Sequence, residues 1–496
     1  MSPARWFQAA PSATLPGLSA RLHRGLRRPR RAALPVLLLV GTGALLSACG
    51  PSITSGAADG AAESGSESPG EGTVAASEAA TDPAVLTAPS TDSPSGEITI
   101  WDRSGDLFEV FEATIDDFNE VYPDITVNHE AVDIDAKLQN TLITGTDVPD
   151  GVFLDDARVA GYSEYLWDLS GVLDPYLADI APQKVDVNTL DGGIYGVPFD
   201  LDPGLLFYNE AALSEAGIDA TTIQTYDDLL EAARQYKQAR PDSGPIHLEQ
   251  SPFLGQLQLE MFASQLGTSI ADEQGELRLD SPEYEQILTM LDTVQREGLG
   301  TRAEYLSPSD IEPLESGQQV FYPWAIWFSF APQQLLPETA GDWRAMPLPA
   351  WEDSGARSGA MGGSSFVLPR DGENADLAWL FYEFLMFDEA GYSAVWGPND
   401  VYPEGLNTSI PAYRLAADPA APLFGPVEAL GGQDLWAVAT AAGEEIPGGA
   451  PIPEWWAGAV DYLGTDVQRM LDGDLTPTEV LEGSTTEIQT NLVDRS

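Results

Sequence analysis

From Gly96 onward the chain alternates between two hydrophobic patterns, and this alternation limits the fold more than any other feature. Glu97–Trp101 alternates polar and apolar residues, as a strand does. Apolar residues then recur at helical spacing as far as about Tyr122. The pattern continues with a strand at Asp124–Val127, a helix at Ala136–Thr144 and a short buried strand at Gly151–Leu154. Strands that alternate with helices predict an α/β fold with a parallel sheet covered on both faces.

Three later helices carry recognisable start signals. Thr225 stands before two acidic residues, and Ser281 is followed by Pro282 at the first helical position. Asn374 is predicted to cap a helix over Ala375–Phe387. No fixed-period repeat is present, which argues against a solenoid or a propeller.

The first 48 residues have the features of an export signal. They contain seven Arg and no acidic residue, and the apolar run Ala32–Leu46 follows. This run is shorter than the roughly 20 residues that span a bilayer. The segment Leu46-Ser47-Ala48-Cys49 resembles a bacterial lipobox, in which the cysteine after the cleavage site is lipidated. The alternative is a buried core cysteine after an uncleaved helix. The lipobox is favoured, because the only cysteine in the chain falls at the one position that the lipobox pattern requires.

Residues 49–95 are expected to form a disordered tether. Ser, Ala, Gly, Thr and Pro dominate this segment, which has acidic residues but no basic or aromatic ones. Such a composition buries too little apolar surface to offset the entropy of ordering. We therefore expect residues 1–48 to be removed and residues 96–496 to form the folded domain.

Composition excludes several classes of function. The formal net charge of −55 over 496 residues leaves no basic footprint for nucleic acid. One Cys excludes a disulfide framework and multi-Cys metal sites, and three His argue against a His-based metal site. We expect no cofactor, no metal and no catalytic step.

Five ordered segments resemble the family 1 extracellular solute-binding proteins of ABC importers, the maltose-binding-protein-like group. The resemblance covers the chain from about Gly96 to its C-terminus. The first segment is Ile98–Asp102 with Tyr122–Val127, and the second is Val148–Asp156. The third comprises Gly193–Pro198, Leu206–Asn209, Ala216–Ile218 and Thr225–Leu229. The fourth is Glu315–Gly317 with Pro323–Ala325, and the fifth is Gly362–Pro369.

The resemblance implies a bilobal fold with a ligand cleft between two α/β lobes. Lobe one is expected over about 96–200 plus 350–396, and lobe two over about 204–346 plus 403–496. The chain is expected to cross between lobes near 200–203, 347–349 and 396–402. Closure of the lobes around solute is a hinge motion that presents the solute to a permease.

The candidate ligand residues are those that suit a sugar. Aromatic faces cover C–H patches of sugars, whereas carboxylates and Arg hold the hydroxyl groups. Trp324 and the pair Trp455-Trp456 match segments that line the family's cleft. The complete set of predicted ligand residues is Trp101, Asp102, Arg103, Asp155, Asp156, Arg158, Asp200, Asp202, Trp324, Trp327, Gly362, Gly363, Ser364, Trp455 and Trp456. Core packing for each Trp, and a cap or a solvated charge for each acid, remain the alternatives.

Two rival functions remain open from the sequence. A surface-anchored glycoside hydrolase would need two carboxylates that flank the scissile bond, and only the abundance of acids supports it. A polyamine or another cationic solute would suit an acid-lined cleft. The favoured interpretation is a monomeric receptor, lipid-anchored through Cys49 on the extracellular face. It binds a mono- or oligosaccharide and delivers it to an ABC permease with its ATPase.

Overall fold

The computed structural model describes residues 84–91, 93–103, 106–272, 274–352, 355–400, 402–448 and 452–495. These residues fall within one compact unit that spans Glu78–Ser496. The predicted leader, Cys49 and most of the predicted tether lie outside the described residues. None of the helices in the described part is long and apolar enough to cross a membrane.

Lobe one is built on a five-stranded mixed sheet with the strand order β2-β1-β3-β13-β6. Its strands are β1 (Gly96–Asp102), β2 (Ile125–Ala131), β3 (Gly151–Asp155), β6 (Val197–Pro198) and β13 (Ser364–Val367). The helices of this part are α1 (Asp106–Val121), α2 (Ile134–Thr144), α3 (Asp156–Val159), α4 (Ser170–Leu173), α5 (Pro182–Asp186), α12 (Ala375–Phe387) and α13 (Glu389–Trp396). A small hairpin of β4 (Thr189–Leu190) and β5 (Gly193–Ile194) completes it.

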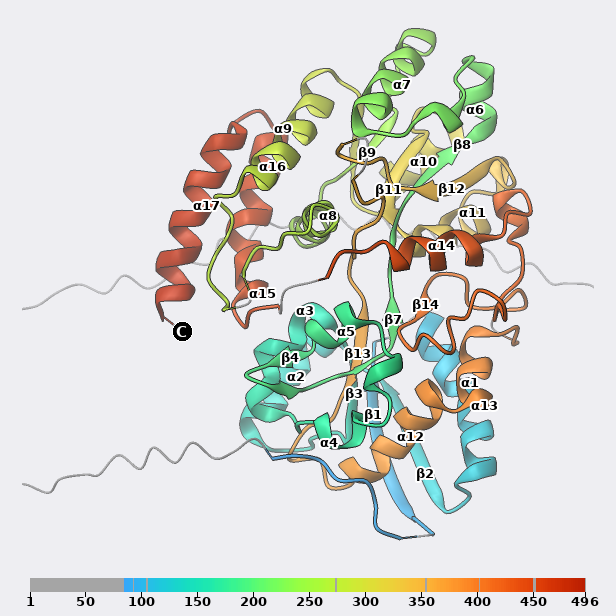
Figure 1. Ribbon diagram of the computed structural model, residues 1–496, viewed down its shortest axis with the longest axis vertical. Helices are drawn as coiled ribbons and strands as arrows, with labels where there is room; N and C mark the ends of the chain where they lie inside the picture. Colours follow the sequence, from blue (N-terminus) through green and yellow to red (C-terminus); the bar gives the residue numbers. More distant parts are fainter. Residues whose placement is uncertain are drawn as a thin grey trace, which may run out of the picture. The chain divides into compact units, whose positions relative to one another are not determined.

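Lobe two contains a second five-stranded sheet with the order β10-β9-β11-β8-β12. Its strands are β8 (Gly204–Asn209), β9 (Ile246–Glu249), β10 (Gly300–Ala303), β11 (Phe321–Ala325) and β12 (Trp343–Pro347). Its helices are α6 (Glu210–Glu215), α7 (Tyr226–Ala239), α8 (Pro252–Gln265), α9 (Pro282–Arg296), α10 (Pro308–Ser316), α11 (Phe330–Gln334), α14 (Leu435–Glu444), α15 (Trp456–Ala459), α16 (Thr465–Leu471) and α17 (Pro477–Asn491). Figure 1 shows the two groups of elements, with β7 (Asp200–Leu201) and β14 (Ile410–Pro411) between them.

The bilobal α/β prediction is confirmed, but the sheets are not purely parallel. β1 runs parallel to β2 and β3, and β9 runs parallel to β10 and β11. β13 is antiparallel to β3, and β8 is antiparallel to β11 and β12. The physical reason is connectivity, because β13 enters the lobe-one sheet as the chain returns from lobe two.

Three chain crossings lie side by side between the lobes. Ile410 pairs with Leu201 in the antiparallel β7–β14 ladder, and Pro203 forms an antiparallel bridge with Ala360. Residues 348–350 still pack in lobe two, where Ala350 bridges to Thr225. The second crossing therefore falls near 360–364, later in the chain than the sequence pattern indicates.

The third crossing also lies later than expected. Trp396, Leu406 and Tyr413 belong to the hydrophobic core of lobe one, whereas Phe424 belongs to that of lobe two. Trp396 and Leu406 are buried in the lobe-one core, so the chain does not leave lobe one near 396–402. Ile410 packs with lobe two in the β7–β14 ladder, whereas Tyr413 and Ala416 pack again in lobe one.

The boundary of the predicted tether also shifts. Ala84 and Leu86 exchange backbone hydrogen bonds with Asp168 in lobe one, at 3.0 and 2.8 Å. Leu86 is buried in the lobe-one core. Residue 95 is therefore too late a boundary, because Val85-Leu86 provides an apolar pair that packs before β1 begins.

The helix signals have mixed outcomes. Thr225 forms a complete capping box with Asp228 at the start of α7, and α9 begins at Pro282 as predicted. α12 spans the predicted residues, but the Asn374 side chain makes no cap hydrogen bond. Its amide instead donates to the carbonyl of Glu97 at 3.1 Å.

Candidate ligand site between the lobes

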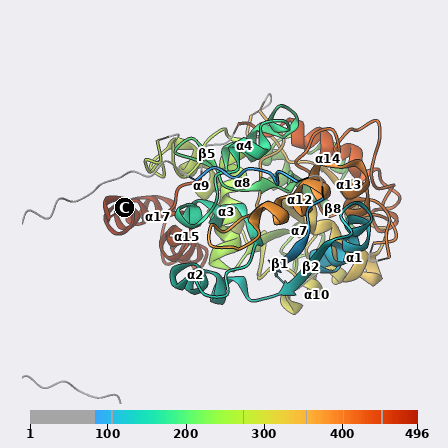
Figure 2. The same cartoon turned by 90° about the horizontal axis from the view of Figure 1, so that it is seen from below.

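A cavity of about 720 Å³ lies between the lobes, and residues of both lobes and of the crossings line it. The lobes approach each other away from the crossings as well, where α15 contacts α3. Figure 2 shows α15 beside α3 from a second direction. Arg158 of α3 lies over the Phe253 ring of α8, 5.4 Å from its centroid, which gives a cation–π contact across the lobes.

Lobe one and the crossings supply the polar side of the cavity. Arg103 forms an ion pair with Asp155 and donates to the Ser364 hydroxyl at 2.7 Å. Lys184 forms a buried ion pair with Asp156 and lies 3.9 Å from an Asp200 oxygen. All six of these residues line the cavity.

Two glycines allow the backbone to approach this charged group. Gly362 and Gly363 have φ angles of +78° and +106°, which side chains with a Cβ rarely adopt. A Cβ on Gly363 would lie 2.6 Å from Lys184 Nζ and 2.7 Å from Asp156 Oδ2. The Gly363 carbonyl also accepts from the Asp156 N–H at 3.0 Å. Gly363 thus brings the second crossing against the Lys184–Asp156 pair.

Asp200 and Asp202 are buried carboxyl groups on the first crossing. Burial raises the pKa of Asp200 to about 6, although Lys184 and the Ser364 N–H favour its charged form. Burial, with the nearby charge of Asp200, raises the pKa of Asp202 well above its ordinary range. Asp202 lines the cavity, and its buried Oδ1 has no hydrogen-bond partner among the described residues.

Lobe two supplies an apolar and aromatic side. Phe253, Tyr305, Trp327 and Trp456 line the cavity. Tyr305 and Trp327 meet edge to face with ring centroids 4.8 Å apart, and Phe253 meets Trp456 in the same way at 6.0 Å. Glu260 of α8 adds one carboxyl group, and burial raises its pKa to about 7.

Ten of the predicted ligand residues line the cavity, and the structure brings them together from both lobes and the crossings. They are Arg103, Asp155, Asp156, Asp200, Asp202, Trp327, Gly362, Gly363, Ser364 and Trp456.

The other five predicted residues do not line the cavity. Trp101 and Trp324 are 2% and 0% exposed, so both are packed in the core. Asp102 is buried and accepts a hydrogen bond from the Arg103 N–H at 2.6 Å. Arg158 lies beside Asp155, with Nε 3.7 Å from its Oδ2, and Trp455 packs against the lobe-two core.

Sequence reasoning missed four prominent lining residues. Lys184 had a usable signal, because it is one of only three Lys in the chain. Phe253, Glu260 and Tyr305 carry no distinguishing pattern, since each belongs to an ordinary helix or loop sequence. Their place at the cavity depends on how the elements of lobe two pack.

Comparison with known proteins agrees with this architecture. The sequence profile of the family described as bacterial extracellular solute-binding protein matches residues 102–392. An arabinooligosaccharide-binding protein of Halalkalibacterium halodurans is 26% identical over 315 residues, which are 60% of this chain and 69% of that protein. A lactose-binding protein of Rhizobium radiobacter is 28% identical over 378 residues, which are 73% of this chain and 84% of that protein.

Solved structures are similar over most of the described chain. The galacto-N-biose/lacto-N-biose I-binding protein of Bifidobacterium longum, in complex with lacto-N-biose, superposes with a TM-score of 0.66. It is 18% identical and covers 82% of this chain and 98% of its own. The sugar-binding protein MalE of Xanthomonas citri has a TM-score of 0.66 and 21% identity, covering 81% of this chain and 98% of its own. At these identities the likeness establishes the fold.

Proposed function

Since this chain belongs to the bacterial extracellular solute-binding proteins, a family of binding proteins rather than enzymes, we propose that its solute is a mono- or oligosaccharide. The observation that carries the proposal is the two-sided lining of the cavity. Aromatic side chains form one side, and hydrogen-bonding carboxylates with Arg103 and Lys184 form the other. This division matches the apolar ring faces and polar hydroxyl groups of a sugar.

Within this site we assign roles to individual side chains. Trp327 stacks on a sugar face, the small exposed part of Trp456 contacts the sugar beside it, and Asp202 forms a hydrogen bond with a hydroxyl group. Arg103 and Asp155 also line a second cavity of about 450 Å³, which supports room for more than one sugar unit. The names of the two sequence relatives, for arabinooligosaccharides and lactose, point to the same class of solute.

The proposed route continues to the membrane. Lobe closure around the sugar presents it to an ABC permease driven by an ATPase. Cys49 carries the lipid that holds the monomeric receptor at the outer face of the cytoplasmic membrane. Cys49→Ser is expected to move the expressed protein from the membrane fraction to the medium, and retention in the membrane fraction would contradict the anchor.

A cationic solute such as a polyamine is the second candidate. It is favoured by the five carboxyl groups in the lining, namely Asp155, Asp156, Asp200, Asp202 and Glu260. Charge attraction weakens as salt shortens the screening length from about 10 Å at 0.1 M to about 3 Å at 1 M. Sugar affinity should barely change over that range, whereas polyamine affinity should fall steeply.

A thermal-shift screen tests the proposal. The panel contains arabino-oligosaccharides, lactose, maltose and other sugars, with spermidine and putrescine as the cationic arm. A ligand at 100 times its Kd stabilises the folded state by about 2.7 kcal/mol, so the shift is readily measured. We expect a sugar to raise the melting temperature. A shift with polyamines alone would overturn the proposal in favour of the second candidate.

Two Trp variants connect the screen to the cavity. Trp327→Ala should weaken sugar binding about tenfold, or ~1.4 kcal/mol, through loss of a stacking face. Trp456→Ala should weaken it less, because Trp456 is only 3% exposed. Trp351→Ala is the matched control, because Trp351 packs on Tyr226 in lobe two, outside the cavity lining. Equal losses of sugar affinity in all three variants would contradict the roles assigned to Trp327 and Trp456.

A further inference from the structure

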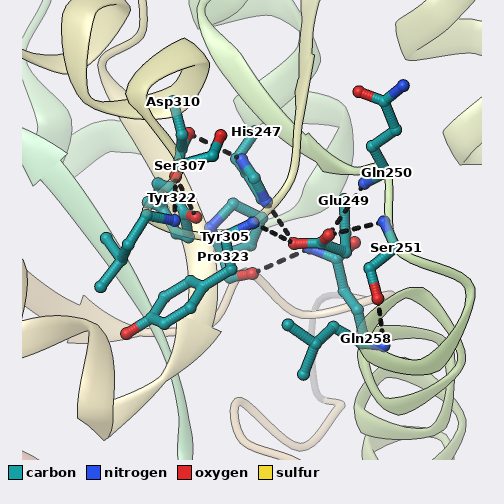
Figure 3. Close-up of polar contacts among 12 residues, drawn as sticks. His247, Glu249, Gln250, Ser251, Gln258, Tyr305, Ser307, Asp310, Tyr322 and Pro323 are labelled. Atoms are coloured by element: carbon teal, nitrogen blue, oxygen red, sulfur yellow. Dashed lines mark hydrogen bonds and ion pairs between the residues drawn. The ribbon is translucent and has the colours of Figure 1, made fainter.

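A cluster of buried charges lies in lobe two behind the aromatic side of the cavity. His247 is fully enclosed on β9, with Nε2 3.3 Å from Glu249 Oε2 and Nδ1 3.3 Å from Asp310 Oδ1. Its ring stacks on Tyr322 at 4.1 Å and meets Trp324 edge to face at 5.3 Å. Figure 3 shows His247 between the two carboxylates.

The two carboxylates hold consecutive backbone groups of the loop between β10 and α10. Glu249 Oε2 accepts from the Tyr305 N–H at 3.0 Å, and Asp310 Oδ2 accepts from the Leu306 N–H at 3.0 Å. Leu306 has a φ of +52°, an unusual backbone conformation for a residue with a Cβ. Such a conformation persists only where surrounding contacts hold it, and these two hydrogen bonds are contacts of that kind.

This loop forms part of the cavity wall. Tyr305 and Leu306 line the cavity, and the Tyr305 ring stacks on Trp324 at 5.3 Å with an interplanar angle of 6°. Trp324 in turn meets the cavity-lining Trp327 edge to face at 5.2 Å. The buried Trp324 therefore supports the two aromatic rings that face the cavity.

Glu249 also fixes a second wall element, the start of α8. Its Oε1 accepts from the backbone N–H groups of Gln250 and Ser251 at 3.0 and 2.7 Å. Ser251 is the N-cap of α8, and its hydroxyl accepts from the Leu254 N–H at 3.3 Å. α8 carries Phe253, Leu254 and Leu257 into the cavity lining.

The charge state of the cluster suits this bridging role. Burial disfavours a charged imidazole, but the attraction of Asp310 and Glu249 outweighs it and raises the pKa of His247. The pKa of Asp310 is lowered despite its burial, because His247, Tyr322 and the Leu306 N–H favour the carboxylate. A protonated His247 donates from Nε2 to Glu249 and forms an ion pair with Asp310 through Nδ1, and so compensates the two buried carboxylates.

We propose that Glu249, His247 and Asp310 are positioning residues for the binding site, which tie the Tyr305–Leu306 turn and the start of α8 into one preorganised wall. None of the three lines the cavity, so they act on the ligand through Tyr305, Leu306 and α8. The inference extends the proposed sugar function, but it can be tested without any ligand.

Hydrogen exchange of the unliganded protein, followed by mass spectrometry, provides the test. In His247→Gln, peptides that cover residues 303–308 and 250–254 should exchange at least tenfold faster than in the wild type. Asp466→Asn is the matched control, because Asp466 accepts from the buried Ser484 at 3.2 Å in lobe two and does not line the cavity. It should leave both wall peptides at the wild-type rate.

A milder variant keeps the proposal falsifiable if His247→Gln does not fold. Tyr322→Phe removes only the hydroxyl that donates to Asp310 at 2.8 Å and keeps the ring that stacks on His247. It should speed exchange of the 303–308 peptide about threefold, with the melting temperature close to that of the wild type. Wild-type exchange of this peptide in a folded His247→Gln or in Tyr322→Phe would overturn the proposal, as would equal loosening by Asp466→Asn. Failure of the sugar screen alone would leave these results unchanged.

Discussion

Asp202 combines burial with an unpaired carboxylate oxygen at the wall of the cavity. Because its folded pKa is raised, it keeps a proton in the folded state at pH values where the unfolded chain has lost it. The wild type therefore loses stability from this group as pH rises from about 4, the ordinary Asp pKa, through the folded pKa.

Asp202→Asn removes this penalty. We expect the variant to be more stable than the wild type at pH 8, by about 1–3 kcal/mol, with no difference below about pH 4. Urea unfolding at both pH values measures it. Asp219→Asn is the control, and its stability at pH 8 should change in the opposite direction, since hydrogen bonds from Thr221 lower the pKa of Asp219. A less stable Asp202→Asn protein at pH 8 would show that Asp202 is charged and paired.

Gly363 allows a separate test of how closely the second crossing approaches the buried ion pair. Gly363→Ala places a Cβ against both Lys184 and Asp156, at a φ of +106°. Gly341→Ala introduces the same methyl group at a φ of +88° with nothing within 4 Å. The control should lose about 1–2 kcal/mol from backbone strain alone. Gly363→Ala should lose about 1–3 kcal/mol more, through overpacking, and equal losses in urea unfolding would contradict the close approach.

At the scale of elements, α8 links the cavity wall to the opposite lobe. Its Phe253 lies under Arg158 of α3, so the two helices meet across the ligand site.

Phe253→Leu keeps an apolar side chain but removes the cation–π contact, worth about 0.5–1 kcal/mol at such a site. We expect the sugar identified in the screen to dissociate about two- to fivefold faster, measured by stopped-flow fluorescence. Leu254→Ala is the comparison, because it shortens a lining side chain of the same helix without touching that contact. A wild-type rate in Phe253→Leu would mean that the contact does not oppose opening.

The elements also show what local sequence can and cannot predict. Thr225 was recognisable as a cap because a capping box depends only on residues three positions apart. Asn374 is also a cap residue type, but Leu377 three positions on cannot complete a capping box, and the Asn374 side chain donates to the carbonyl of Glu97 in a neighbouring strand. Competition from a distant segment is invisible in a local pattern.

The candidate site shows the same limit of local sequence, because the packing of distant segments decides which residues line the cavity. Trp324 and Trp327 are three residues apart and look equivalent in sequence, yet Trp324 is completely buried and Trp327 lines the cavity. β11 ends between them, so one ring faces the sheet packing and the other faces the cleft. The position of the third crossing likewise depends on how Leu406, Tyr413 and Ala416 pack on lobe one. Neither outcome is encoded in spacing alone.

For the whole molecule, we expect the net charge of −55 to affect the stability of the fold more than the choice of ligand. Like charges repel one another in the compact state, and salt screens that repulsion. We expect the melting temperature to rise as NaCl increases from 0.1 to 2 M, in the absence of any ligand. A melting temperature that stays constant or falls would show that repulsion among these charges does not limit stability.

We propose above all that a carbohydrate is captured in the cavity between the lobes. The most direct measurement is a crystal structure of the protein with the sugar identified in the screen. It should show a sugar ring on Trp327 or Trp456 and a hydroxyl group within hydrogen-bond distance of Asp202. A bound sugar outside this cavity, or a cavity that excludes every sugar in a protein shown to bind one, would contradict the account.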